Sequence, residues 1–237
     1  MSVSALVIVP TYNERGNLPI LVRALLAYDN VRVMVVDDNS PDGTGAVAEE
    51  LAAAYPGRLE VMHRTGRRGL GRSYIDGIKQ AIQEPVDVIC QMDADLSHDP
   101  GHLPSLIEAT AHADVVIGSR YIPGGAIVNW PLRRRLLSRM ANVYIRMVTR
   151  LGVSDCTTGY RCWRREAMAS MPLDRFFSEG YSFLIEMLFV AARRGYRIAE
   201  VPITFVDRRE GASKMSRGVM VESVLMPWRL AVRRRIR

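Results

Sequence analysis

Residues 86–95 read VDVICQMDAD, and this stretch decides the fold. A run of apolar, β-forming residues ends in two aspartates, Asp93 and Asp95, that are separated by one alanine. Such a run is typical of a strand buried on both faces of a parallel sheet. In open α/β sheets, ligands bind at the carboxyl ends of the strands. The stretch therefore predicts a central strand with an acidic binding site at its end.

The rest of the first half repeats this alternation of strand and helix. Strand-like runs are expected at Ala5–Val9, Val31–Val36, Leu59–Met62, Val86–Met92 and Asp114–Gly118. Helical patterns lie between them, at Gly16–Ala27, Thr44–Ala54, Gly71–Gln83 and Pro100–Ala111. Alternating elements of this kind predict an α/β protein with a mostly parallel central sheet flanked by helices.

The second half reads as an extension of the same domain. A Gly- and Pro-containing loop at 122–131 precedes a basic helix over about residues 131–151. An apolar helix at 181–193, a strand-like run at 196–206, a loop at 207–216 and a terminal amphipathic helix follow. No repeat or low-complexity linker divides the chain, so we expect one domain over residues 1–237.

Charge is divided between the two halves. Residues 1–118 carry 9 basic and 16 acidic side chains, net −7, whereas residues 119–237 carry 23 and 9, net +14. All of the 32 basic residues except Lys79 and Lys214 are arginines, whose planar guanidinium groups suit forked contacts with phosphate or carboxylate. We expect the second half to bind such groups.

The sequence favours a cytoplasmic protein. It shows no secretory signal pattern and no uninterrupted apolar run long enough to span a bilayer. Cys90, Cys156 and Cys162 show no metal-ligand spacing and suit buried thiols in a reducing compartment. The basic C-terminal residues 233–237 follow apolar and aromatic side chains, so we expect peripheral contact with an anionic membrane surface.

Two acidic pairs are candidate binding groups. Asp93 and Asp95 repel each other unless a cation lies between them, and Mg²⁺ or Mn²⁺ suits oxygen ligands shared with substrate phosphates. Ser97 or His98 could add a ligand. Asp37 and Asp38 close another strand, where a carboxylate can accept from a nucleobase. The alternative for both pairs is turn chemistry.

The glycine-rich stretch at 66–71, GRRGLG, does not fit a cofactor motif. Tyr74 stands where a dinucleotide fingerprint needs a small residue, and no Gly-Lys-Ser/Thr of a P-loop is present. An NAD-dependent oxidoreductase is therefore disfavoured, and a tight entry into the next helix is expected. Arginines at strand ends and in loops, namely Arg120, Arg134, Arg161 and Arg208, instead form a phosphate-binding pattern.

In chain order, PTYNE, DDNSPDGT, GLG, DADLSHDP, SRY, the Trp-Pro-basic helix, TTGYR and VDRREGASK resemble the inverting glycosyltransferases of family 2. Within that family they are similar to the dolichol-phosphate (polyprenyl-phosphate) mannose synthases. The resemblance covers nearly the whole chain. It implies a GT-A (Rossmann-like) fold, GDP-mannose as donor, a divalent metal, and a polyprenyl phosphate acceptor.

The resemblance also implies roles for individual residues. The nucleotide would be held by Pro10, Tyr12, Glu14, Asp37, Asp38 and Ala94. The metal would be held by Asp93, Asp95 and Ser97, and the donor and acceptor phosphates by Arg120, Arg134, Ser138, Arg208 and Lys214. Of these, Asp95, Arg120 and Arg134 would be catalytic. Residues 1–118 thus form a nucleotide- and metal-binding half, and residues 119–237 an acceptor-binding half.

Two departures from the family pattern leave alternatives open. Many relatives have Gln where Ser97 stands, and some carry C-terminal membrane spans that this chain does not show. The chain resembles the short form, which must reach its lipid through its terminal segment or a membrane partner protein. One alternative function is another family 2 activity, such as glucosyl transfer from UDP-glucose to the same lipid. Another is a non-catalytic basic module for membranes or nucleic acid, although no nucleic-acid-binding signature is present.

Overall fold

The computed structural model describes residues 3–178, 180, 182–207 and 217–232. The elements of the first half are β1 (Ala5–Thr11), α1 (Leu18–Leu26), β2 (Val31–Asp37), α2 (Thr44–Ala54), β3 (Leu59–His63), α3 (Leu70–Ala81), β4 (Val88–Gln91), the 3₁₀ turn η1 (Pro100–His102), α4 (Leu103–Ala109) and β5 (Val115–Ser119). Every strand and helix that the sequence predicts in this half is confirmed, with boundaries shifted by a few residues.

The second half contributes β6 (Ala126–Val128), α5 (Leu132–Thr149), β7 (Arg161–Arg164), α6 (Arg165–Ala169), the 3₁₀ turn η2 (Leu173–Arg175), α7 (Ser182–Arg193), β8 (Ile198–Pro202), β9 (Thr204–Val206) and α8 (Arg217–Val232). The three long helices of this half, the basic, apolar and terminal ones, are confirmed. No helix in the described part of the chain is long and apolar enough to span a membrane.

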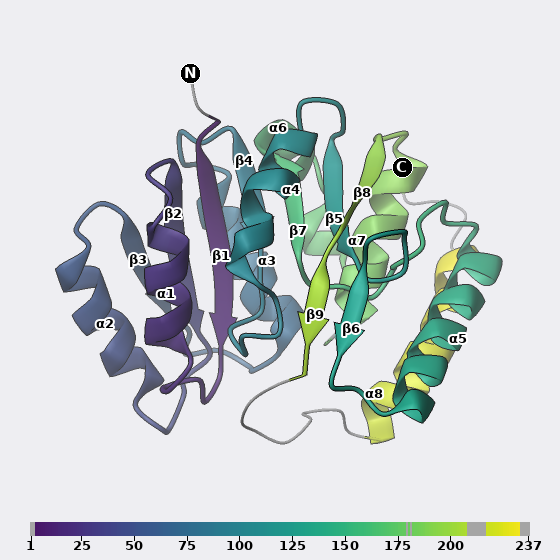
Figure 1. Cartoon of the computed structure of the whole chain (residues 1–237), viewed down its shortest axis with the longest axis horizontal. Helices are drawn as coiled ribbons and strands as arrows, with labels where there is room; N and C mark the ends of the chain where they lie inside the picture. Colours follow the sequence, from purple (N-terminus) through teal and green to yellow (C-terminus); the bar gives the residue numbers. More distant parts are fainter. Residues whose placement is uncertain (1–2, 179, 181, 208–216, 233–237) are drawn as a thin grey trace.

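The main sheet has the strand order β3-β2-β1-β4-β7-β5-β8. Its described pairings are parallel except those of β7, which runs antiparallel between β4 and β5. This confirms the mostly parallel sheet. Alternate residues of β1 serve two cores, because Leu6 and Ile8 join one cluster and Val7 and Val9 the other. Helices therefore cover both faces (Figure 1).

Helix α3 packs unusually close to the sheet, against β1 and β2. A Cβ on Gly77 would come within 2.9 Å of methyl groups of Ile8 and Val36, so only glycine lets this helix lie so near the sheet. At the start of α3, Gly69 has a φ of 154° and its amide donates to Asp38. The expected tight entry into the helix is confirmed.

The sequence did not predict the short strands β6 and β7 or the pairing of two cysteines. β7 reads Arg-Cys-Trp-Arg, and its two arginines hide the strand pattern within a polar stretch. β6 lies in the predicted loop and pairs with β9 in a second sheet, which splits the expected run at 196–206 after Pro202. The prediction of unpaired thiols is wrong for Cys90 and Cys162, which face each other across β4 and β7 as a disulfide. The remaining cysteine, Cys156, is buried, and burial raises the pKa of its thiol to about 12.

Candidate active site

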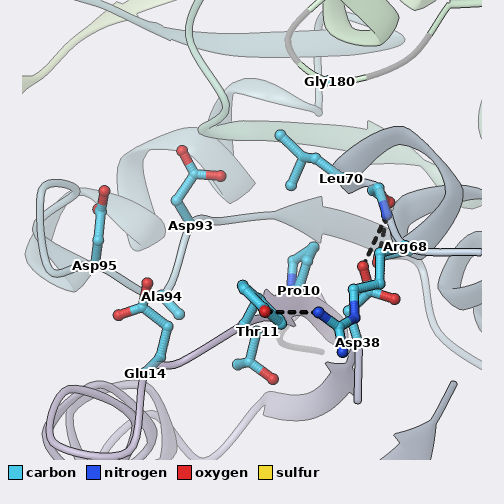
Figure 2. Close-up of a pocket in the computed structure, with 13 residues that line it drawn as sticks. Pro10, Thr11, Glu14, Asp38, Arg68, Leu70, Asp93, Ala94, Asp95 and Gly180 are labelled. Carbon is cyan, nitrogen blue, oxygen red and sulfur yellow. Dashed lines mark hydrogen bonds between the residues drawn. The ribbon is translucent and has the colours of Figure 1, made fainter. Parts of the chain in front are cut away.

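A cavity of about 440 Å³ opens at the carboxyl ends of β1, β2 and β4, beside the start of α3. Its walls are polar and apolar side chains of the first half of the chain, and the backbone of Gly180 from the second half completes them (Figure 2). The lining residues are Pro10, Thr11, Tyr12, Glu14, Asp38, Arg68, Gly69, Leu70, Ser73, Asp93, Ala94, Asp95 and Gly180. The volume falls in the range of small-molecule sites, and most of the residues predicted to hold the nucleotide meet here.

The two aspartates at the end of β2 differ in their surroundings. Asp38 lies in the cavity wall, where it accepts from Arg64 and, at 2.8 Å, from the Gly69 amide. Asp37 lies outside the lining, and its carboxylate accepts from the hydroxyls of Thr11 and Ser40 at 3.2 and 2.5 Å. Asp37 therefore holds the turn after β2, and Asp38 is the member of the pair that a ligand can reach.

The loop after β1 brings an aromatic ring and an acid to the cavity. Arg68 donates to the Tyr12 hydroxyl at 2.7 Å, and its guanidinium carbon lies 4.9 Å from the centre of the Tyr12 ring. The Glu14 amide donates to the Thr44 hydroxyl, and the carboxylate of Glu14 accepts from Asn17. The glycine-rich stretch and the β1 loop thus close over one end of the cavity together.

Asp93 and Asp95 direct their carboxylates to the same side of the loop after β4 (Figure 2). Asp93 accepts from the Tyr74 hydroxyl at 3.3 Å, and a Cβ on Gly159 would lie 2.9 Å from its carboxylate oxygen. Asp95 is buried and accepts from the Ser97 amide at 3.1 Å. Two adjacent carboxylates suit Mg²⁺ or Mn²⁺, which usually complete their coordination with substrate phosphate and water. The donor set therefore fits the predicted metal.

Ser97 and His98 lie behind this loop, outside the cavity lining. Both are buried, and the Ser97 hydroxyl and His98 Nδ1 have no hydrogen-bond partner among the described residues. The His98 ring packs against Tyr160 and Phe205, and its burial lowers its pKa to about 4. The described residues also contain no cluster of three or more His, Cys, Asp or Glu side chains around one point. A metal here would depend on Asp93 and Asp95.

Arg120 follows β5 and is locked in a buried ion pair. Its Nε and Nη2 donate to the two oxygens of Asp155 at 2.7 and 2.8 Å, and Nη2 also donates to Thr157 at 2.8 Å. Burial opposes the charge of Arg120, but the adjacent Asp155 carboxylate raises its pKa above the ordinary value. Correspondingly, Arg120 outweighs burial and lowers the pKa of Asp155. The guanidinium carbon also lies 5.4, 5.8 and 5.2 Å from the ring centres of Tyr121, Trp130 and Phe205.

Helix α5 carries the other predicted acceptor residues. Arg134 lies 4.0 Å above the Trp130 ring and donates to both oxygens of Asp207 at 3.0 Å. Ser138 accepts from the Tyr121 hydroxyl at 2.7 Å. One turn later, Asn142 accepts from the Cys156 amide at 2.7 Å, which fastens the loop after α5 to the helix. Arg120 and Asn142 thus meet at one loop, 155–158.

One candidate of the phosphate-binding pattern is wrong. Arg161 is completely buried in β7, and its nitrogens donate to the carbonyls of Thr158, Leu184 and Cys156. This burial lowers its pKa to about 10. Arg161 therefore supports the strand from inside. Arg208 and Lys214 lie outside the described residues.

Several residues that build the site were not predicted from the sequence. Arg64 is buried between Asp38 and Asp76, and Asp155 holds Arg120. Glu200 accepts from the amides of Ser154 and Asp155 at 2.7 and 3.1 Å. Each partner is 12 or more residues away along the chain. Arg64 directly follows β3, whereas Asp155 lies in the loop before β7 and Glu200 lies within β8, so no shared sequence signal identified them.

A Rossmann-like sheet, a cavity of small-molecule size at its carboxyl edge and an Asp-X-Asp pair in the cavity wall suit a site for a nucleotide and a divalent metal. The chain belongs to the family described as "Glycosyl transferase family 2", whose sequence profile matches residues 6–171. It is therefore a glycosyltransferase.

Two relatives match most of the chain. A protein named polyprenol monophosphomannose synthase, from Mycolicibacterium smegmatis, is 50% identical over 213 residues, which are 89% of this chain and 80% of that protein. A protein named undecaprenyl-phosphate mannosyltransferase, from Micrococcus luteus, is 47% identical over 231 residues, which are 96% of this chain and 95% of that protein.

Solved structures show the same fold. The glucosyl-3-phosphoglycerate synthase of Mycobacterium tuberculosis, crystallised with Mn²⁺, UDP-glucose and phosphoglyceric acid, matches with a TM-score of 0.70 at 19% identity. The match covers 96% of this chain and 80% of that one. The expected glycosyltransferase A fold is thereby confirmed.

Proposed function

We propose that the protein transfers mannose from GDP-mannose to a polyprenyl phosphate, with inversion at the anomeric carbon. The observation that carries this proposal is the similarity, over most of the chain, to two relatives, one named as a synthase of polyprenol monophosphomannose and the other as an undecaprenyl-phosphate mannosyltransferase. The geometry supports it, because Asp93 and Asp95 line the cavity and Arg120 lies near enough for the Asp93 carboxylate to help raise its pKa. The single catalytic domain has a donor half at 1–118 and an acceptor half at 119–237.

The donor occupies the cavity in this proposal. Asp38 accepts from the nucleobase, and Pro10, Tyr12, Glu14 and Ala94 form the surrounding wall. Asp93 and Asp95 would hold Mg²⁺ or Mn²⁺, which would supply positive charge to stabilise the departing diphosphate. The contacts of Asp93 with Tyr74 and of Asp95 with the Ser97 amide orient both carboxylates before the donor binds.

The acceptor brings its own nucleophile. A phosphate monoester has a second pKa near ~6, so at neutral pH its oxygen carries charge and needs no general base. That oxygen bonds to the anomeric carbon as the bond from this carbon to the diphosphate breaks, and GDP leaves. Arg120, Arg134 and Ser138 orient the acceptor phosphate and reduce its repulsion from the donor. We propose that Arg208 and Lys214 also contact the phosphates of donor and acceptor.

A lipid acceptor also implies a location. We propose that the protein is peripheral, on the cytoplasmic face of a membrane, and that its C-terminal basic segment or a membrane partner protein brings it there. The Cys90–Cys162 disulfide removes the support that the cysteine pattern gave to a reducing compartment. The proposed location at the cytoplasmic face of a membrane therefore depends on the proposed nucleotide-sugar donor and lipid acceptor alone.

Transfer of label tests the proposed function. Purified protein, detergent-dispersed polyprenyl phosphate, a divalent cation and labelled GDP-mannose should yield label in the solvent-extractable lipid. EDTA should abolish the transfer, and UDP-glucose should be a poor donor. Efficient transfer from UDP-glucose alone would show a glucosyltransferase, and no transfer from any nucleotide sugar would reject the proposal.

A further inference from the structure

Arg64 is a buried arginine that lies behind the wall of the cavity. It directly follows β3, its side chain keeps only 6% of its surface accessible, and it is outside the cavity lining. Its amide donates to the carbonyl of Asp37 at 2.9 Å, which ties the end of β3 to the end of β2. An arginine in this position affects a bound ligand through the residues that it contacts.

The guanidinium group of Arg64 is fixed by contacts from all three of its nitrogens. Nε donates to Asp76 at 2.7 Å, and Nη1 donates to Asp38 and, at 3.2 Å, to the Ser73 hydroxyl. Nη2 donates to the carbonyl of Arg67 at 3.2 Å. These partners lie on the turn after β2, on the glycine-rich stretch and on α3, so Arg64 joins three segments of the chain.

Three residues of the cavity wall form a closed ring of hydrogen bonds with Arg64. They are Asp38, Gly69 and Ser73, and all three line the cavity. The Ser73 hydroxyl donates to the Gly69 carbonyl at 3.2 Å, and the Gly69 amide donates to Asp38 at 2.8 Å. Arg64 Nη1 contacts both Asp38 and Ser73, which closes the ring.

The ring fixes the orientation of the Asp38 carboxylate. Arg64 donates to Oδ1 and the Gly69 amide donates to Oδ2, so rotation of the carboxylate would break both bonds. An ionised carboxylate has about four acceptor sites, and two donors leave acceptor sites for a ligand. Since a guanidinium group donates and does not accept, Asp38 offers the cavity fixed acceptors for N–H groups.

We propose that Arg64 is a positioning residue for nucleobase recognition, because it holds Asp38 in the orientation that accepts from the N–H groups of the base. This inference deepens the proposed function, on which it rests for the placement of the nucleobase at Asp38. A carboxylate that is already oriented does not have to be ordered when the nucleotide binds, and such preorganisation strengthens binding. Loss of Arg64 therefore weakens nucleotide binding and leaves binding of the acceptor unchanged.

Arg58 is the matched control for loss of an arginine beside β3. It directly precedes the strand that Arg64 follows, and it lies outside the cavity lining. Its Nη2 donates to the carbonyls of Tyr28 and Val31 at 2.6 and 2.9 Å. If Arg64 only supported the fold, loss of either arginine would have similar consequences.

Equilibrium dialysis of labelled GDP against the whole protein, at saturating Mn²⁺, tests the role of Arg64. We expect Arg64→Gln to weaken GDP binding about tenfold, and Arg64→Lys, which keeps the charge, to weaken it only about threefold. Arg58→Gln should bind GDP within about twofold of the unmodified protein. In transfer assays, the KM for polyprenyl phosphate should stay within about twofold in all three variants.

A double-mutant cycle shows whether Arg64 acts through Asp38. In an Asp38→Asn background, Arg64→Gln should change GDP affinity by less than about twofold, because the effects of residues that act through each other are not additive. A full additional loss in that background would overturn the proposal.

Two other results would also overturn it. One is unchanged GDP affinity in Arg64→Gln, and the other is an equal loss in Arg58→Gln. If Arg64→Gln does not reach the unmodified melting temperature, Arg64→Lys replaces it in the same cycle, and unchanged GDP binding in Arg64→Lys would contradict the role. Binding of UDP in place of GDP would reject the proposed donor, and the same cycle with UDP would then decide the role of Arg64.

Discussion

At the scale of single residues, Gly159 fixes the position of Asp93. A Cβ at this glycine would lie 2.9 to 3.2 Å from the carboxylate atoms of Asp93. Those atoms belong to the movable end of a side chain, so an added methyl group displaces the carboxylate and leaves the backbone in place. Gly159 is thus a positioning residue for the proposed metal site.

We predict that Gly159→Ala weakens metal-dependent binding of GDP by about tenfold, the loss typical of disturbed residues behind a metal ligand. The melting temperature should change little. Titration calorimetry with GDP, at several Mn²⁺ concentrations, measures the effect. Gly152→Ala is the control, because a Cβ at Gly152 has no neighbour within 4 Å. Equal GDP affinity in both variants would show that Asp93 tolerates the displacement.

Asp95 allows a sharper test of metal dependence. We predict that Asp95→Asn lowers transfer by at least about 100-fold, because one carboxylate cannot hold the cation that stabilises the leaving diphosphate. Asp99→Asn, four residues away, removes a negative charge, and the side-chain oxygen of asparagine can still accept from the Gly101 amide. That control should keep most of its activity when initial rates are compared at saturating metal. Comparable loss in the two variants would contradict the role of Asp95.

The sequence predicted which residues meet at the site better than it predicted what each contacts. A strand that ends in polar residues identified Asp38, Asp93 and Asp95, because the geometry of parallel sheets brings such ends together. The sequence did not show which of Asp37 and Asp38 lines the cavity, because the directions of the two side chains depend on the conformation of the turn after β2. The buried Arg161 looked the same in the sequence as an arginine that binds phosphate.

At the scale of elements, the Arg120–Asp155 pair joins the end of β5 to the loop after α5. Both side chains are buried, with 6% and 0% of their surfaces accessible. Removing one member of a buried, hydrogen-bonded pair leaves the other charge uncompensated. The pair therefore stabilises the fold and orients the acceptor side of the site at once.

We predict that Asp155→Asn lowers the free energy of unfolding by about 3 kcal/mol at neutral pH. The folded-state pKa of Asp155 is below its ordinary value of 3.8, so its contribution is present above that pH and is lost as the pH falls towards the folded-state pKa. The difference between variant and unmodified protein should be constant from about pH 5 to 8 and should shrink below about pH 4. Urea denaturation at a series of pH values measures it.

The exposed pair of Lys79 and Asp174 provides the control for that experiment. Asp174 keeps 84% of its side chain accessible, so Asp174→Asn should change stability very little. A difference between Asp155→Asn and the unmodified protein that grows as the pH falls would have the wrong sign and would contradict the assignment.

Elements with a strong local pattern were predictable, and elements defined by distant partners were not. The strands and helices of the first half alternate at spacings that a single sequence reveals. Strand β7 has four residues, two of them arginines, and exists because β4 and β5 pair with it on either side. The short β6 and β9 likewise pair with each other across 75 or more residues.

At the scale of the whole molecule, the acidic and basic halves of the chain contribute different parts of the site. The acidic first half supplies most of the cavity wall, including Asp93 and Asp95. The basic second half brings Arg120 and, through Asn142, helix α5 to the loop at 155–158. We propose that donor and acceptor bind to different halves and meet beside β4 and β5.

The measurement that tests this division most directly is the pair of substrate constants for Arg134→Gln. Initial rates of mannose transfer are measured with each substrate varied in turn, and donor affinity is checked by calorimetry with GDP. The division predicts that KM for the polyprenyl phosphate rises about tenfold or more, as expected for the loss of a charged phosphate contact, while GDP affinity stays within about twofold. An equal loss for donor and acceptor would place Arg134 on the donor phosphates and contradict the division.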